Sequence, residues 1–118
     1  MAQPLRNPEE LQKTLNEFEE LSRQMQIMAA QRQQLSFQVE ELKVAEEAIS
    51  KLGKETIYRA IGPILVETSK ADALADINER KELYDLRIGM LLKQEEKLRP
   101  RLEELRAQLE KVLKEKQQ

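Results

Sequence analysis

Acidic pairs such as Glu9–Glu10 and Glu19–Glu20 are residues whose type and spacing could do chemistry, as metal ligands or as an acid and a base. The chain of 118 residues contains no His and no Cys. It therefore lacks the commonest metal ligand, the usual general base near neutral pH and any thiolate nucleophile. Adjacent glutamates in such a sequence are typical of a solvated helical face. We therefore expect no catalytic, cofactor-binding or metal site, no cofactor and no enzyme activity.

The charge balance argues against a broad nucleic-acid surface. The chain has 20 Lys and Arg against 22 Asp and Glu, a net charge of −2. Residues 93–116 carry eight basic and six acidic side chains, a weak excess that leaves an RNA-binding arm as a minor alternative.

The longest strongly apolar stretch, residues 61–66, is too short to cross a bilayer, and the N-terminus lacks the apolar run of a secretory signal. We expect a cytoplasmic protein that binds neither nucleic acid nor a membrane.

Two long helices are predicted, over residues 8–52 and 70–116. Ala, Glu, Lys, Leu and Arg make up more than half of the chain, which is typical of long helices or coiled coils. Asn7 and Ser69 are suitable N-caps for the two helices, and Gly53 suits the C-terminal end of the first. Because the two helices are nearly equal in length and their connector is short, we expect them to form a long antiparallel coiled-coil hairpin.

A heptad repeat defines an apolar seam, the a and d positions of the two helices, and 19 of its 24 residues are apolar. Gly89 and Pro100 fall outside it, at positions b and f, and Pro100 is expected to kink the second helix. The seam consists of Leu11, Thr14, Phe18, Leu21, Met25, Met28, Arg32, Leu35, Val39, Leu42, Glu46 and Ile49 in the first helix, and of Leu74, Ile77, Lys81, Tyr84, Ile88, Leu91, Glu95, Leu98, Leu102, Leu105, Leu109 and Val112 in the second.

Four seam positions carry charges, Arg32 and Glu46 in the first helix and Lys81 and Glu95 in the second. Each helix spaces its two charges by 14 residues, so antiparallel folding brings Glu46 to Lys81 and Arg32 to Glu95. Such pairs set the register of a coiled coil more than they stabilise it. The alternative is that the long side chains reach past the seam to water.

A short β-hairpin is predicted over residues 56–68, with strands at about 56–61 and 64–68 around Gly62-Pro63. Both of its faces carry apolar side chains. Two strands alone are marginally stable in water, and their outer edges are open to further pairing. We therefore expect an oligomer held by strand pairing between copies of this or related chains. The expected contact residues are Ile57, Tyr58, Ile61, Ile64, Leu65 and Val66.

Apolar residues also gather where the chain begins and ends. Leu15 and Leu113 occupy e positions beside the seam, and antiparallel folding brings them to the same end. These residues either widen an ordinary apolar stripe or form a surface for apolar client segments, and the residues alone do not decide between the two. The set consists of Leu5, Leu11, Leu15, Phe18, Leu105, Leu109, Val112 and Leu113.

The order helix, one β-hairpin, helix resembles a β-class prefoldin subunit of the archaeal type. The hairpin sequence Ile57-Tyr-Arg-Ala-Ile-Gly-Pro-Ile-Leu-Val66 is similar to that of the family, as is the run Arg32-Gln-Gln-Leu35 in a Gln-rich first helix. The resemblance covers nearly the whole chain and implies one prefoldin-like domain over residues 1–118. A single hairpin matches the β class, because the α class carries two.

The resemblance implies an ATP-independent chaperone. Prefoldins are hexamers of two α and four β subunits, in which the hairpins form a double β-barrel platform and the coiled coils project from it. Their tips hold non-native polypeptides and pass them to a group II chaperonin, which favours a client-binding role for the apolar end of this chain. The alternative function is a coiled-coil oligomer that acts as a spacer or scaffold.

Overall fold

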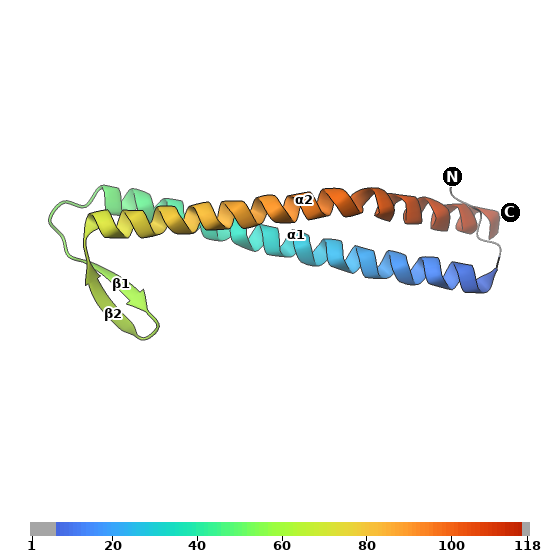
Figure 1. Ribbon diagram of the computed structural model, residues 1–118, viewed down its shortest axis with the longest axis horizontal. Coiled ribbons are helices and arrows are strands. Elements are labelled where there is room, and N and C mark those ends of the chain that lie inside the picture. Colours follow the sequence, from blue (N-terminus) through green and yellow to red (C-terminus); the bar gives the residue numbers. More distant parts are fainter. Residues whose placement is uncertain (1–6, 117–118) are drawn as a thin grey trace. The chain divides into compact units, whose positions relative to one another are not determined.

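The computed structural model describes residues 7–116 of the chain, which form two helices and one β-hairpin (Figure 1). Helix α1 spans Pro8–Ser50 and helix α2 spans Lys70–Lys116. Between them, strands β1 (Ile57–Ile61) and β2 (Ile64–Thr68) form an antiparallel pair. The predicted order of elements is confirmed.

The chain divides into two compact units. The terminal unit combines α1 up to Gln31 with α2 from Met90, and the hairpin unit holds residues Arg32–Gly89. In each unit the α1 and α2 segments lie side by side and run in opposite directions (Figure 1). Among the described residues, neither helix contains a stretch apolar and long enough to cross a membrane.

Both helices begin at the predicted N-caps. The backbone N–H of Glu10 donates to Asn7 Oδ1 at 2.8 Å, and that of Asp72 donates to Ser69 Oγ at 3.0 Å. Each bond satisfies one of the first-turn N–H groups that have no partner inside the helix. The caps explain why local sequence alone located both starting points.

The predicted C-terminal end of α1 is wrong. The helix stops at Ser50 instead of residue 52, and Gly53 has no positive φ, so it is not a left-handed C-cap. Instead, Nζ of Lys70 donates to the carbonyl oxygens of Ser50 and Leu52, at 2.9 Å each. A lysine from the first turn of α2 thus satisfies the carbonyl of the last residue of α1 and one carbonyl just beyond it, where a positive charge is favourable. This partner is distant in sequence, and the local pattern around Gly53 did not predict it.

The seam predicted from the heptad repeat is confirmed, because all of its 24 residues are buried or partly buried. The least exposed apolar residues are Leu21 and Leu105 in the terminal unit and Val39 and Ile77 in the hairpin unit. Helix α2 continues without interruption through Pro100, which is exposed. The kink expected there stays a prediction.

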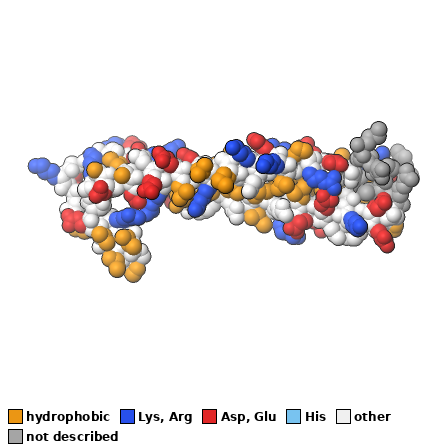
Figure 2. Space-filling model, viewed as in Figure 1, with side chains coloured by type: hydrophobic (Ala, Val, Ile, Leu, Met, Phe, Trp, Pro, Cys, Tyr) orange, Lys and Arg blue, Asp and Glu red, His pale blue; other side chains and the backbone are white. Residues whose placement is uncertain are grey.

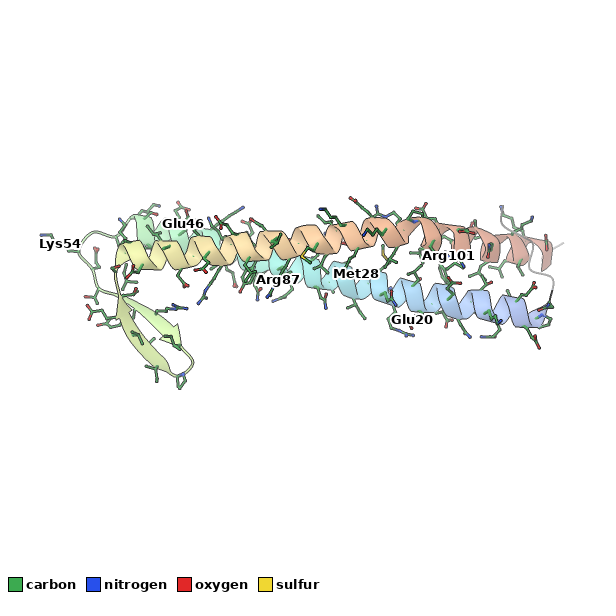
Figure 3. All side chains as sticks on the ribbon, viewed as in Figure 1. Glu20, Met28, Glu46, Lys54, Arg87 and Arg101 are labelled. Carbon is green, nitrogen blue, oxygen red and sulfur yellow. The ribbon has the colours of Figure 1, made fainter. Side chains whose placement is uncertain are left out.

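One of the two expected seam ion pairs lies within the hairpin unit and is confirmed. Nζ of Lys81 donates to Glu46 Oε2, and both side chains are partly buried (Figure 3 labels Glu46). This contact fixes the expected register of the two helices in that unit. Arg32 and Glu95 belong to different units, and their pairing stays a prediction.

The β-hairpin closes through a two-residue turn, as predicted. Ile61 lies opposite Ile64, and Gly62 between them has a φ of 57°. Among the described residues Gly62 alone has a positive φ, so Pro63 keeps an ordinary negative φ. A positive φ at the first turn position only is the signature of a type II′ turn, which suits the right-handed twist of a hairpin.

Candidate functional site

An apolar groove lies in the terminal unit, between the beginning of α1 and the end of α2. Its cavity volume is about 420 Å³. The sides of the groove are supplied by one stretch of each helix. The lining residues are Leu11, Leu15 and Phe18 from α1, and Arg106, Leu109, Glu110, Val112 and Leu113 from α2. We call this site the terminal groove.

The terminal groove exists because both helices carry a leucine at an e position, next to the seam. Leu15 is 37% exposed and Leu113 is 60% exposed, so these side chains extend the apolar surface outward. The seam residues Leu11, Phe18 and Leu109 between them are partly buried. The result is a concave apolar surface that a further apolar side chain can contact without any rearrangement of the seam.

The structure gathers most of the residues expected at the apolar end into this one groove. Leu11, Leu15, Phe18, Leu109, Val112 and Leu113 line it. Leu105 does not, because its side chain is fully buried in the seam. Leu5 lies outside the described residues. Sequence reasoning missed the two charged residues of the lining, Arg106 and Glu110, one turn apart on α2.

An ion pair joins the two helices near the inner end of the terminal groove. The Nε and Nη2 atoms of Arg101 donate to the two carboxylate oxygens of Glu17, both at 2.8 Å. A second carboxylate, that of Glu104, lies 3.3 Å from Nη1 of the same guanidinium. Figure 3 labels Arg101 at this point of α2. Both residues of the interhelical pair occupy g positions, a signal in the heptad that sequence reasoning did not use.

The hydrogen bonds of this pair shift the pKa values of both groups. Donation by Arg101 lowers the pKa of the Glu17 carboxyl, and the same bonds raise the pKa of the Arg101 guanidinium. Both side chains are about half exposed, so solvent and salt screen the interaction. The pair is charged at neutral pH, and its fork geometry makes it more directional than an ordinary surface ion pair.

The hairpin presents a second apolar surface, in the hairpin unit. Figure 2 shows hydrophobic side chains gathered on it. Of the six residues expected to make subunit contacts, Ile57 alone is partly buried. The other five are between 44% and 68% exposed, namely Tyr58, Ile61, Ile64, Leu65 and Val66. Such exposure of large apolar side chains on so small an element is unusual for a surface that stays in water.

The side of the hairpin nearest the helices is held by polar contacts as well as by Ile57. Arg59 Nη2 lies 3.5 Å from Asp76 Oδ1 in α2, and Arg80 Nε lies 3.3 Å from the other oxygen of the same carboxylate. Thr68, opposite Ile57 in the register, is also partly buried. The base of the hairpin therefore contacts α2, while its turn and most of its apolar side chains remain exposed.

Several apolar side chains outside the seam are exposed along the outer faces of the helices, and sequence reasoning did not single them out. Phe37 and Val44 occupy f positions of α1, while Leu83, Leu86 and Met90 occupy c and f positions of α2. The heptad repeat contained this signal, because c and f positions are normally polar.

The acidic pairs lie on exposed helical surface. Glu9, Glu10, Glu19 and Glu20 are all exposed, and Glu20 makes an ion pair at 2.8 Å with Arg23, one turn further along α1 (Figure 3). Within residues 7–116, no cluster of three or more acidic side chains is placed to hold a metal ion.

Comparison with known proteins identifies the family. A family model described as "Prefoldin subunit" matches residues 12–116. The prefoldin subunit beta of Archaeoglobus fulgidus is 36% identical over 107 residues, 90% of this chain and 92% of that protein. The prefoldin subunit beta of Thermococcus onnurineus is 34% identical over the same shares of the two chains.

The fold agrees with a solved structure as well. The crystal structure of the prefoldin beta subunit from Thermococcus strain KS-1 superposes with a TM-score of 0.78 at 30% identity, and the match covers 94% of this chain and 97% of that one. Two long helices joined by one β-hairpin are thus confirmed as the β-class arrangement.

The family consists of chaperone subunits that assemble with other prefoldin subunits, and it is not an enzyme family. The alternative function, a spacer or scaffold, is therefore not favoured. The chain belongs to the prefoldin family, and it resembles the β-class subunits of archaea.

Proposed function

We propose that this chain is a subunit of an ATP-independent holdase, which binds non-native polypeptides in the terminal groove. The observation that carries the proposal is the groove itself, a concave apolar surface that encloses a cavity of about 420 Å³ between the beginning of α1 and the end of α2. Exposed apolar segments distinguish an unfolded client from a folded protein. A groove lined mainly by apolar side chains binds such segments through the hydrophobic effect, without requiring a particular sequence.

Weak binding at each groove suits this role. The ends of paired helices near chain termini open intermittently, which exposes additional seam residues to a client. Several subunits in one assembly present several grooves, so a long unfolded chain can contact more than one at a time. Avidity then raises the overall affinity without strong binding at any single groove.

The β-hairpin is the proposed assembly element. Its exposed apolar faces and open strand edges need partners, and hairpins of other subunits supply the same chemistry. We propose a cytoplasmic hexamer of four chains of this β class and two α-class prefoldin subunits, with the hairpins paired into a β-barrel platform. Residues 1–118 act as a single prefoldin-like domain in it. The hexamer hands its clients to a group II chaperonin and uses no cofactor, nucleic acid or membrane.

The test replaces the two exposed leucines of the terminal groove. The variant Leu15→Gln/Leu113→Gln makes the groove polar while leaving its buried seam residues in place. The matched control, Leu83→Gln/Leu86→Gln, replaces two exposed leucines of α2 outside the groove, which are 45% and 62% exposed. Each protein is assembled with its α-class partner and assayed for suppression of the aggregation of reduced, denatured lysozyme in the absence of ATP.

We expect the groove variant to form an assembly of normal mass but to need about thirtyfold more protein for half-maximal suppression, since the two leucines together contribute about 2 kcal/mol of apolar burial. The control should protect lysozyme as the parent chain does. Equal protection by the groove variant and the parent would show that the groove is structural. Client binding would then have to be sought elsewhere, for example on the wall of the cavity between the coiled coils.

A further inference from the structure

The Glu17–Arg101 pair joins the innermost turn of the terminal groove on α1 to the part of α2 just beyond the groove. Glu17 immediately precedes Phe18, the innermost groove residue of α1. Arg101 precedes Arg106, the first groove residue of α2, by five residues, or about 7.5 Å along the helix. The seam residues Leu102 and Leu105 lie on α2 between the pair and the groove. The pair is therefore placed to limit how far an opening that starts at the chain ends can extend inward.

Helix α2 has a weak point next to the pair. Pro100 has no backbone N–H, so it cannot donate the helical hydrogen bond to the carbonyl of Glu96. The last turns of α2 are consequently held to the preceding ones by one backbone bond fewer. Arg101, the next residue, connects these turns to α1 through two hydrogen bonds of 2.8 Å each. The fork geometry resists both sliding and separation of the two helices at this point.

We propose that Glu17 and Arg101 are positioning residues that limit the separation of the helix ends and thereby set how much of the apolar seam the terminal groove offers to a client. The inference rests on the proposed client-binding role of the groove. With the pair intact, opening is confined to the groove. When the pair is broken, opening extends inward and exposes seam residues such as Leu102 and Leu105.

Hydrogen exchange on the assembled full-length protein tests the positioning role without any client. In the variant Glu17→Gln we expect amides of residues 14–21 and 101–109 to exchange about two- to fivefold faster, the effect of losing one exposed interhelical ion pair. The matched control is Glu104→Gln, which removes the other carboxylate beside Arg101 but leaves the contact between the helices. The control should exchange at the rate of the parent. Raising the salt concentration should speed exchange in the parent and leave Glu17→Gln nearly unchanged.

A double variant shows whether the two residues act as a unit. Glu17→Gln and Arg101→Gln should each have the same effect on exchange, and combining them should add nothing. Faster exchange in Glu104→Gln equal to that in Glu17→Gln, or additive effects in the double variant, would overturn the proposal.

Capture of reduced, denatured lysozyme then tests the consequence for the groove. Glu17→Gln should capture this client about twofold faster than the parent, because more apolar surface is exposed, while Glu104→Gln should match the parent. Faster exchange without faster capture would overturn the link between the pair and the groove. A parent chain that captures no lysozyme at all would instead reject the proposed function, and the exchange result by itself would still decide whether the pair limits opening.

Discussion

The terminal groove and the β-hairpin both present apolar side chains to solvent, yet they offer a partner different things. In the groove the backbone is helical, so its hydrogen bonds are made within each helix and only side chains are available. In the hairpin each strand pairs with the other on one side, which leaves one edge of each strand with open N–H and C=O groups. In the roles proposed for them, the groove can therefore accept many apolar segments, whereas the hairpin pairs with a partner strand in a defined register.

One short chain thus presents two apolar surfaces of different kinds, one built from side chains alone and one that includes open strand edges. Exposed apolar area is similar in kind at the two sites, with Leu113 60% exposed in the groove and Ile64 61% exposed in the hairpin. What separates the sites is whether the backbone is already satisfied. Hydrophobic contact is non-directional, while strand pairing fixes both direction and register.

The largest effect is expected from Val66→Asp, which places a charge on the proposed assembly surface of the hairpin. A charge on this strand would be buried between subunits without a partner, at a cost of several kcal/mol. We expect dissociation to monomers or dimers that keep their helical circular dichroism, measured together with mass by light scattering. Glu67→Gln, on the neighbouring position of the same strand, should assemble normally. A full-size assembly of Val66→Asp would show that the hairpin is not the assembly element.

The next effect concerns the seam that supports the hairpin. Lys81→Glu places two carboxylates together at Glu46, and we expect a loss of about 2 kcal/mol, less than for a fully buried pair because both side chains are partly exposed. The double variant Glu46→Lys/Lys81→Glu should recover most of that loss. Thermal unfolding followed by circular dichroism gives the comparison. No recovery in the double variant would argue that these side chains reach to water independently.

Two glycines give opposite and smaller effects. Gly62→Ala should destabilise the hairpin by about 1–2 kcal/mol, because its φ of 57° disfavours any side chain although no atom lies within 4 Å of the added Cβ. Gly89→Ala should stabilise α2 by about 1 kcal/mol, since its added Cβ also meets no atom within that distance and the residue is helical. The fraction assembled should fall in the first variant, and the melting temperature should rise in the second. Stabilisation by Gly62→Ala would contradict the assigned turn, and destabilisation by Gly89→Ala would contradict the open helical environment assigned to that residue.

The smallest effect is expected on the pKa of Glu17, in the terminal unit, when Arg101 is replaced. The pKa of Glu17 lies below the ordinary value for Glu, about 4.3, because Arg101 donates to the carboxylate. A depressed pKa in the folded state stabilises above the pKa of the unfolded chain, and this contribution is lost as the pH falls through the folded-state pKa. Carboxyl NMR titration should show the low pKa in the parent and its return toward the ordinary value in Arg101→Gln. An unchanged pKa in that variant would place the cause of the shift elsewhere.

Much of this fold follows from local sequence signals. The N-caps Asn7 and Ser69 and the Gly62-Pro63 turn each depend on residues within four positions of one another. The seam depends on a repeat of seven residues, which is why every predicted a and d position is buried or partly buried. The predicted end of α1, at residue 52, was wrong by two residues. The helix ends at Ser50, whose carbonyl is bound by Lys70, 20 positions away in the sequence. Which side chains of the apolar end form a groove also depended on packing, as the full burial of Leu105 illustrates.

The helices, the turn and the register of Glu46 against Lys81 follow from local sequence signals, because hydrophobic periodicity and charge spacing act along the chain. In contrast, it is the packing of the two helices that brings Leu15 and Leu113 into one groove and joins Arg101 to Glu17 near its inner end. Those contacts depend on which flank of each helix faces the other. A heptad assignment identifies the residues of the seam, but it does not show which partners the residues beside the seam contact. Side chains at e and g positions can reach either a neighbouring helix or water, and three-dimensional packing makes that choice.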